Sequence, residues 1–336
     1  MLVDSTFNYV KRTEVPEHKD AKYLEYRKEW ESRPGEHRSG RFPIHLDLEP
    51  ANGCNYRCIY CYQSFCPEKI MPFGFMDFAL YKKLIDEGVA KGLYSVKLCF
   101  RGEPLLHPQI VEMVKYAKDK GVLEVLMNSN CSLLTEDMSR KLIEAGLDKL
   151  ICSVDGCTKE IYESVRIGGN FENILNNIRK MQELKQRLGK VFPIVRVQVV
   201  DSPSTHAQLD EYFDFWGKTA DDLGVECVND WHYKSLGKVV VCSDFECAML
   251  YQRLIIGWDG RVFICCGNHF GKLIAGDLNK QTIEEVWNGD VYKRLRKLSE
   301  LGLLHKSRIC AECGYRMTVI KNNGFSYAIE DAGYEI

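Results

Sequence analysis

The chain has 336 residues, of which 45% are apolar and 27% charged, and its formal net charge is −2. This near balance excludes a strong electrostatic pull toward nucleic acid or an anionic membrane, and the apolar share is enough for a sizeable core. The N-terminal stretch "MLVDSTFNYVKR" lacks the apolar segment of a secretion signal, and no apolar run approaches the ~18 residues of a membrane span, so we expect a cytoplasmic protein without nucleic-acid or membrane partners.

The predicted elements begin with a helix over residues 19–32, inside an N-terminal extension of residues 1–40, and "RPGEHRSGR" is interpreted as a connector. From residue 41 onward, short apolar runs alternate with helical patterns such as "MDFALYKKLIDEGVAKG" and "FENILNNIRKMQELKQRLG". This alternation indicates an α/β domain over residues 41–234, with a parallel sheet and helices outside it. Periodicity alone leaves open whether the sheet is doubly wound or an incomplete barrel. The predicted strands are 43–49, 94–100, 122–127, 149–154, 193–200 and 224–229.

The alternation stops near residue 234, where the architecture changes. Gly-rich turns, the strand-like runs of "RLIIGWDGRVFICC" and one predicted helix, "TIEEVWNGDVYKRLRKL", follow. We therefore place a domain boundary within residues 234–242 and assign residues 235–336 to a small C-terminal domain.

Unusual residues follow the C-terminal ends of the predicted strands. Three cysteines follow the first strand, "RGEP" (101–104) the second and "NSN" (128–130) the third, while "SVDG" (153–156) and "NDW" (229–231) end the fourth and sixth. In parallel α/β folds the sites are built at this edge. We therefore expect one functional site at the rim.

The three rim cysteines are Cys54, Cys58 and Cys61, among fifteen in the chain. Clustered thiols in a reducing compartment indicate metal or redox ligands rather than disulfides. Structural zinc and iron–sulfur clusters both take four protein ligands, so three thiolates leave one position open, as in catalytic sites. A zinc site completed by Cys66 or a histidine remains an alternative.

The C-x3-C-x2-C run, with Tyr60 directly before its last cysteine, resembles the radical S-adenosylmethionine (radical SAM) enzymes over roughly residues 41 to 232. The resemblance implies an incomplete (β/α)6 barrel, TIM-like in architecture, whose three thiolates hold a [4Fe–4S] cluster with SAM on its fourth iron. It also implies cleavage of SAM to a 5'-deoxyadenosyl radical, which removes a hydrogen atom from the substrate. The cluster would receive its electron from an external reductant such as flavodoxin or ferredoxin.

The "GGEP" stretch of this family appears here as Arg101 followed by Gly102, Glu103 and Pro104. The resemblance implies that this stretch meets the methionyl ammonium of SAM through backbone carbonyls and the acidic side chain, and it places Tyr60 in the cofactor site. Arg101 departs from the pattern, and we expect it to keep the backbone acceptors available but to crowd the loop.

Further site residues are expected on the later strands. Ser153 and Arg166 match positions that hold the ribose or carboxylate of SAM in related enzymes, and an arginine suits a carboxylate because its fork pairs bidentately. Gln198 on the fifth strand is predicted to reach the ribose. At the end of the sixth strand, Asp230 and His232 are candidates for the base that takes a substrate proton.

A second cysteine set comprises Cys247, Cys265, Cys310 and Cys313. It resembles the SPASM/twitch extension of radical SAM enzymes, which implies an auxiliary, fully ligated [4Fe–4S] cluster. Two further cysteines, at positions 242 and 266, are alternative ligands, and a structural zinc ribbon remains open.

The sequence is compatible with three functions. A closed auxiliary cluster cannot bind substrate but can accept an electron, as the resemblance to twitch-bearing dehydrogenases of aminocyclitol biosynthesis implies. We therefore favour oxidation of an alcohol on a sugar- or cyclitol-like small molecule. The alternatives are a peptide-modifying maturase, which forms thioethers or epimerises residues, and a non-catalytic zinc-binding module.

Overall fold

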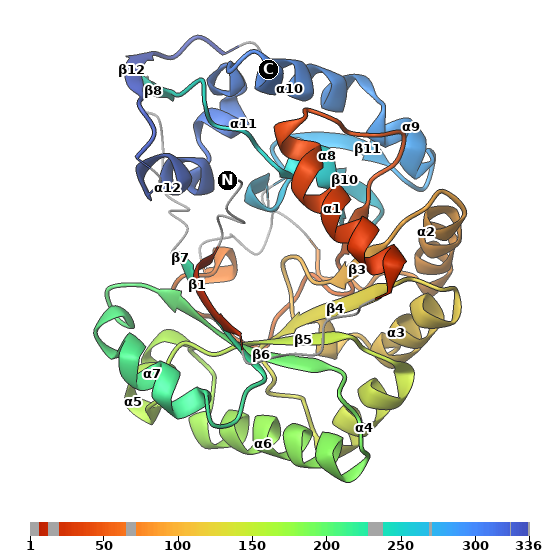
Figure 1. Cartoon of the computed structure of the whole chain (residues 1–336), viewed down its shortest axis with the longest axis vertical. Helices are drawn as coiled ribbons and strands as arrows, with labels where there is room; N and C mark the ends of the chain where they lie inside the picture. Colours follow the sequence, from red (N-terminus) through yellow and green to blue (C-terminus); the bar gives the residue numbers. More distant parts are fainter. Residues whose placement is uncertain are drawn as a thin grey trace.

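The computed structural model describes residues 7–12, 20–64, 72–227, 238–268, 271–322 and 324–334. Within these residues one sheet contains ten strands in the order β1-β7-β6-β5-β4-β3-β2-β9-β10-β11 (Figure 1). Its central strands run parallel and coincide with the six predicted ones. They are β2 (His45–Leu48), β3 (Ser95–Leu98), β4 (Glu124–Ser129), β5 (Lys149–Ser153), β6 (Ile194–Asp201) and β7 (Asp222–Cys227).

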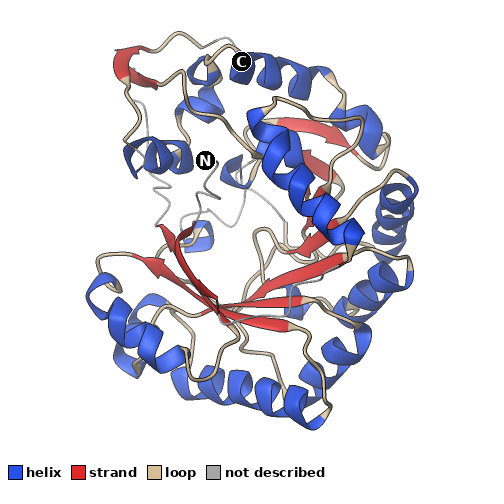
Figure 2. Ribbon diagram, in the orientation of Figure 1, coloured by secondary structure: helices blue, strands red, loops and turns tan. Residues whose placement is uncertain are grey.

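Helices cover the outer face of this parallel sheet (Figure 2). Alternate residues of each strand, such as Leu46 and Leu48 on β2, are fully buried in the main core together with apolar residues of these helices, because successive side chains of a strand point to opposite faces. The arrangement confirms the predicted incomplete barrel with helices outside it. The helices are α2 (Phe78–Ala90), α3 (Ile110–Asp119), α4 (Glu136–Ala145), α5 (Lys159–Val165), α6 (Phe171–Arg187) and α7 (Leu209–Trp216).

The N-terminal helix α1 (Ala21–Gly35) is longer than predicted. It begins at the Asp20 cap and continues through Pro34 into the stretch interpreted as a connector. Arg33 explains the extension, because its guanidinium pairs with Glu29 one turn earlier and donates to the carbonyl of Phe42. These bonds hold the last turn against the disruptive effect of the proline.

The helix predicted over "TIEEVWNGDVYKRLRKL" is in fact two helices, α9 (Ile283–Trp287) and α10 (Asp290–Glu300). The break falls at Asn288, whose side-chain amide donates to the carbonyl of Arg41, and at Gly289, which is extended and begins the second helix. A tertiary contact therefore competes successfully with the continuous helical pattern.

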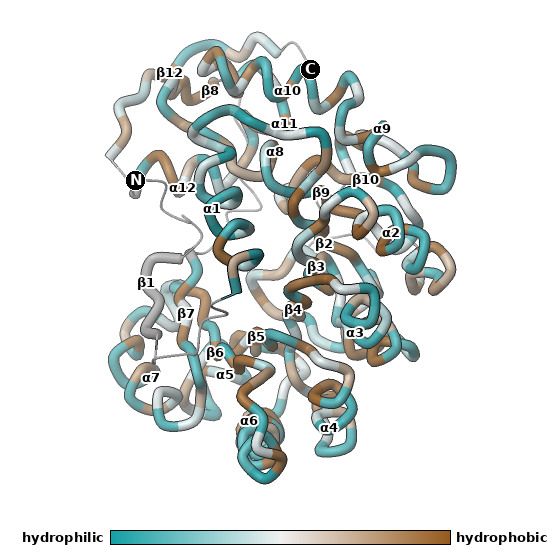
Figure 3. The backbone as a smooth tube through the Cα atoms, turned by 45° about the vertical axis from the view of Figure 1, so that its right-hand side comes forward, coloured by the Kyte–Doolittle hydropathy of each residue, from teal (hydrophilic) through white to brown (hydrophobic). Residues whose placement is uncertain are grey.

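The C-terminal region continues the sheet of the barrel. Strand β9 (Arg253–Ile256) lies parallel to β2, and β10 (Arg261–Phe263) and β11 (Ile274–Asp277) follow antiparallel. Figure 3 shows β2, β9 and β10 as neighbouring stretches of chain. At the opposite edge, β1 (Phe7–Arg12) pairs antiparallel with β7.

The remaining elements of this region are short. A separate two-stranded sheet pairs β8 (Lys238–Val241) with β12 (Ala328–Asp331). The short helices of this region are α8 (Met249–Gln252), α11 (Arg308–Ala311) and α12 (Gly314–Asn322). In the part of the chain that the structure describes, no helix combines the length and the apolar character needed to cross a bilayer.

Candidate active site

The three clustered cysteines lie in the loop after β2, at the C-terminal rim of the sheet. The loop is tied down by its own backbone, because the N–H of Cys61 donates to the carbonyl of Cys58 at 3.0 Å, and the N–H of Ile59 donates to Val165 at the end of α5. The thiols of Cys58 and Cys61 lie close enough to Cys54 to influence its ionisation. Burial raises the pKa of Cys54 to about 12 and that of Cys61 to about 11, so a metal that binds them as thiolates would have to displace their protons.

Gly102 allows the second rim loop to pack directly against the cysteine loop. A Cβ atom at this position would lie 2.2 Å from the carbonyl oxygen of Ala51 and 2.4 Å from that of Gly53. The N–H of Glu103 donates to the same Gly53 carbonyl at 2.8 Å. Only glycine therefore permits this approach of two backbones, and the loops form one unit.

The carboxylate of Glu103 is 2% exposed and joins the ends of two strands. It accepts from the Ser129 hydroxyl at 2.7 Å, from the Asn130 N–H at 2.7 Å and from the Leu105 N–H at 3.0 Å. Burial raises its pKa, and these donors oppose that shift. With Pro104, it starts a short 3-10 turn. Binding of the SAM ammonium by Glu103 remains a prediction, and three bonds to the protein already hold the carboxylate in place.

Arg101 does not crowd the loop, because its guanidinium points toward the C-terminal hairpin. It is 4% exposed, pairs with the buried carboxylate of Glu49 and lies 4.9 Å from the ring centre of Phe100 and 4.5 Å from that of Phe263. Glu49 also accepts from the backbone N–H of Trp258. The residue that departs from the family pattern thus joins the barrel to the C-terminal region.

Arg166 lies next to the cysteine loop, as predicted for a cofactor residue. Its Nη1 is 3.6 Å from the Sγ of Cys58, and its Nε is 2.7 Å from Asp155. Ser153 and Gln198 are register partners on β5 and β6. The Oε1 of Gln198 is buried and has no hydrogen-bond partner among the described residues. This orphaned acceptor and the guanidinium fit a polar ligand such as SAM, although these assignments remain predictions.

Two site residues were missed by sequence reasoning. Asn130, in the "NSN" stretch at the end of β4, donates to Asn55 at 2.8 Å and lies 3.7 Å from the Sγ of Cys54. Its position after a strand was the available signal. Glu49 had no recognisable signal in the sequence, because its role depends on its pairing with Arg101. Tyr60, which was predicted, reaches the Ser204 hydroxyl at 3.2 Å.

The structure brings the four predicted C-terminal cysteines together. A Cβ at Gly267 would lie 3.7 Å from the thiols of both Cys265 and Cys313, and Cys247 and Cys310 are within electrostatic range of the group. These four half-buried thiols fit a fully ligated cluster.

The other nearby cysteines differ from this set. Cys242 is buried, whereas Cys266 is exposed and lies within electrostatic range of Arg253, of Asp47 on the barrel strand β2 and of Cys313 in the set itself. Within the described ranges, no three Cys, His, Asp or Glu side chains are placed to hold a single metal ion. The two candidates for the proton-accepting base, Asp230 and His232, lie outside the described residues.

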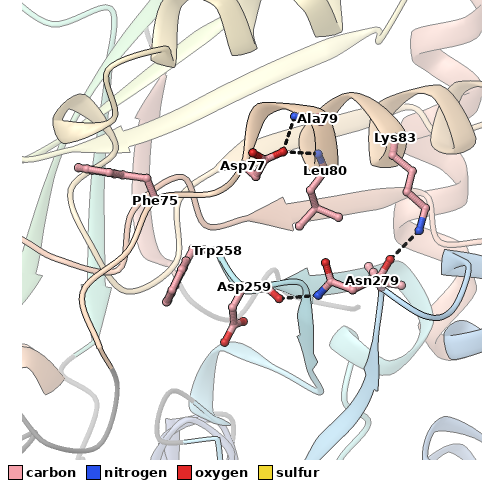
Figure 4. Close-up of a pocket in the computed structure, with 9 residues that line it drawn as sticks. Phe75, Asp77, Ala79, Leu80, Lys83, Trp258, Asp259 and Asn279 are labelled. Carbon is pink, nitrogen blue, oxygen red and sulfur yellow. Dashed lines mark hydrogen bonds between the residues drawn. The ribbon is translucent and has the colours of Figure 1, made fainter.

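A groove of about 610 Å³ separates α2 from the C-terminal hairpin (Figure 4). Three of its polar side chains are engaged in structural bonds, since Asp77 caps α2, Lys83 donates to the Leu278 carbonyl at 2.7 Å and Asn279 donates to the Asp259 carbonyl at 2.8 Å. No predicted site residue lines it. We interpret the groove as a seam between the two parts of the fold.

Two family profiles match the chain. The radical SAM superfamily profile matches residues 48–196, and a profile described as an iron–sulfur cluster-binding domain, SPASM, matches residues 247–314. The AdoMet-dependent heme synthase of Methanosarcina barkeri is 25% identical in an alignment of 325 residues that covers 82% of this chain and 92% of the relative.

Solved structures share the fold. BtrN in complex with AdoMet and 2-DOIA superposes with a TM-score of 0.51 and 20% identity, covering 80% of this chain and 92% of BtrN. Streptococcus suis SuiB bound to precursor peptide SuiA superposes with a TM-score of 0.61 and 14% identity, covering 91% of this chain and 80% of SuiB.

Proposed function

Because the chain belongs to the radical SAM superfamily and carries a C-terminal SPASM iron–sulfur domain, we propose that it oxidises an alcohol of a sugar- or cyclitol-like small molecule. Its cofactors are SAM, a SAM-binding [4Fe–4S] cluster and auxiliary iron–sulfur chemistry in the SPASM domain. When bound, these groups supply a 5'-deoxyadenosyl radical that removes hydrogen from the substrate, and an acceptor for the electron left behind. Family membership removes the hypothesis of a non-catalytic zinc module.

The observation that carries this proposal is the second set of four cysteines, in the C-terminal region. Four cysteines can saturate an auxiliary cluster, which leaves no iron open to the substrate and favours a role in electron transfer. The hairpin of β9 and β10 that carries Cys265 is hydrogen-bonded to β2 of the barrel, and the pair of Arg101 with Glu49 fixes the same contact. The protein therefore holds its electron acceptor in a fixed position relative to the rim.

The residues of the rim would orient SAM and the substrate. The guanidinium of Arg166 suits a carboxylate, and backbone carbonyls of the loop around Gly102 would meet an ammonium group. Gln198 offers a buried acceptor with no partner among the described residues. Such fixed polar groups position the reactants and replace water in the site.

A second candidate is the modification of a peptide. The likeness to SuiB in complex with its precursor peptide, over 91% of this chain, favours it. The likeness to BtrN with 2-DOIA bound favours the small-molecule proposal. The two candidates differ in the mass of the product and in the size of the substrate.

One experiment tests the proposal. The anaerobically reconstituted protein, with SAM and a strong reductant, is incubated with the low-molecular-weight fraction of a cell extract and compared with protein in which Cys310 and Cys313 are both alanine. The intact enzyme should convert one small molecule into a product two hydrogen atoms lighter, whereas the double variant should retain slow release of 5'-deoxyadenosine without that product. A modified peptide, or an oxidised product from the double variant, would contradict the proposal.

A further inference from the structure

The inner face of the sheet, opposite the helices, carries an unusual number of charges. Strand alternation places every second residue there, and many of these positions are polar, whereas the outer positions of the same strands are mostly apolar. We define this inner face by its charged residues and one histidine, which are His45, Asp47, Lys97, Glu124, Lys149, Arg196, Asp222, Glu226 and Arg253.

Most of these charges are paired with one another. Lys149 lies 3.0 Å from Asp222, and Arg196 donates to the same carboxylate at 2.7 Å. Arg253 lies 3.6 Å from Asp47. Pairing is expected, because a buried charge without a partner strongly destabilises the folded protein. The inner face is therefore mostly a set of compensated structural pairs.

Two charges near the rim do not follow this pattern. Lys97 and Glu226 are each the penultimate residue of their strand, β3 and β7, and both are half-buried. Neither forms an ion pair with any described residue, although each is within electrostatic range of the other. Asp47, the register neighbour of Lys97, pairs instead with Arg253. Glu124 is also without an ion pair among the described residues, but it lies at the opposite end of its strand.

The surroundings of these two residues indicate a ligand. Gln198 is 5% exposed, and its buried Oε1 lacks a partner among the described residues. Its register partner on β7 is Gly224, which faces the same way as Glu226, and its side chain interacts with that carboxylate. Burial raises the pKa of Glu226, and Lys97 opposes the shift. A cation and an anion within electrostatic range of each other, and an amide oxygen without a partner among the described residues, thus belong to the inner face just below the rim.

We propose that Lys97 and Glu226 bind the substrate, and that the substrate is a small hydroxy acid of the sugar-acid type. The ammonium of Lys97 would bind the carboxylate of the substrate, and Glu226 would accept a hydrogen bond from a hydroxyl group. A lysine ammonium is a compact, single positive charge, which balances the single charge of a carboxylate better than the nearly double charge of a phosphate. This inference rests on the proposed alcohol oxidation and adds that the substrate carries a carboxylate group.

Binding without turnover tests this inference. D-Gluconate, D-glucuronate and neutral D-glucose are titrated calorimetrically into the anaerobic holoprotein loaded with SAM. At least one acid should bind while glucose does not, and Lys97→Met should weaken that binding by about tenfold or more. Lys97→Arg, which retains the charge, should preserve most of it. Lys115→Met removes a lysine from the exposed pair with Asp119 on α3 and should change nothing.

The role of the carboxylate is tested separately. Glu226→Gln should weaken binding of the sugar acid but not of acetate, which has no hydroxyl group to offer. Iron content and SAM affinity are measured for each variant to show that it is folded and loaded. If neither acid binds the intact protein, or if Lys97→Met binds equally well, the inference is overturned. If an acid binds but no oxidised product forms from any small molecule, the proposed function fails while the binding assignment stands.

Discussion

Arg166, which is predicted to bind the cofactor, also contributes to the fold. Its guanidinium lies between the thiol of Cys58 and the carboxylate of Asp155, and Asp155 in turn accepts from the backbone N–H of Val200 on β6. The positive charge can stabilise a thiolate on one side while a carboxylate fixes its orientation on the other. The residue is therefore held in place before any ligand arrives.

The change Arg166→Ala should weaken SAM binding by about 1.5–3 kcal/mol, the usual loss for a hydrogen bond to a charged group. Equilibrium dialysis of SAM against the anaerobic protein measures it. Arg187→Ala, which removes an arginine paired with Glu136 on the exposed surface, is the matched control and should bind SAM normally. Unchanged affinity in the Arg166 variant would assign this residue a structural role.

At this scale, a short spacing is the most informative signal in the sequence. Cys54, Cys58 and Cys61 could be chosen because residues within one loop are close whatever the fold, and their role as ligands stays a prediction. The partner of Arg101 could not be predicted, because Glu49 and Arg101 meet only when the C-terminal hairpin packs against both. Contacts between distant segments leave no local pattern.

Among the elements, the two rim loops behave as one because glycine allows their backbones to touch. The contact of Gly102 with the carbonyls of Ala51 and Gly53 leaves no room for a side chain. The strands beneath these loops were predictable from apolar alternation. The helix boundaries were less so, because Arg33 extends α1 past a proline and Asn288 interrupts a continuous helical pattern through side-chain bonds that periodicity does not encode.

The change Gly102→Ala should displace both loops and abolish measurable SAM binding, because its Cβ would meet carbonyl oxygens at 2.2 and 2.4 Å. Gly121→Ala is the control. Gly121 has a φ of +90° but open space around it, so alanine should cost about 1–2 kcal/mol in stability and leave the cofactor site intact. Iron content and SAM affinity of the two variants provide the comparison, and normal SAM binding by Gly102→Ala would contradict the role given to this loop contact.

For the whole molecule, the decisive feature is that the sheet does not stop at the barrel. Strand β9 continues it beside β2, and the buried pair of Arg101 with Glu49 lies next to that junction. The predicted boundary within 234–242 marks a change of pattern along the chain, while the hydrogen-bonded sheet includes strands from both sides of it. Sequence patterns describe segments, and this continuity arises only from their pairing.

Arg101→Met should lower the free energy of unfolding by about 3–5 kcal/mol, because it leaves the Glu49 carboxylate buried without its partner. The double change Arg101→Met with Glu49→Gln removes both charges and should recover much of that loss. Anaerobic urea unfolding of the wild type and the three variants of this cycle measures the coupling. Additive effects of the two changes would show that the pair does not hold the junction.

The parallel pairing of β9 with β2 also determines which strand edge is exposed while the chain is being synthesised. On a ribosome, His45 is synthesised long before its register partner Arg253. Until then, the outer edge of β2 presents unpaired N–H and C=O groups to any neighbouring nascent chain, and such edges promote aggregation. A gene fragment that ends within residues 234–242 would make this exposure permanent. Pairing with β9 of the C-terminal region therefore protects the edge of β2 from other nascent chains during biosynthesis, apart from any role of that region in electron transfer.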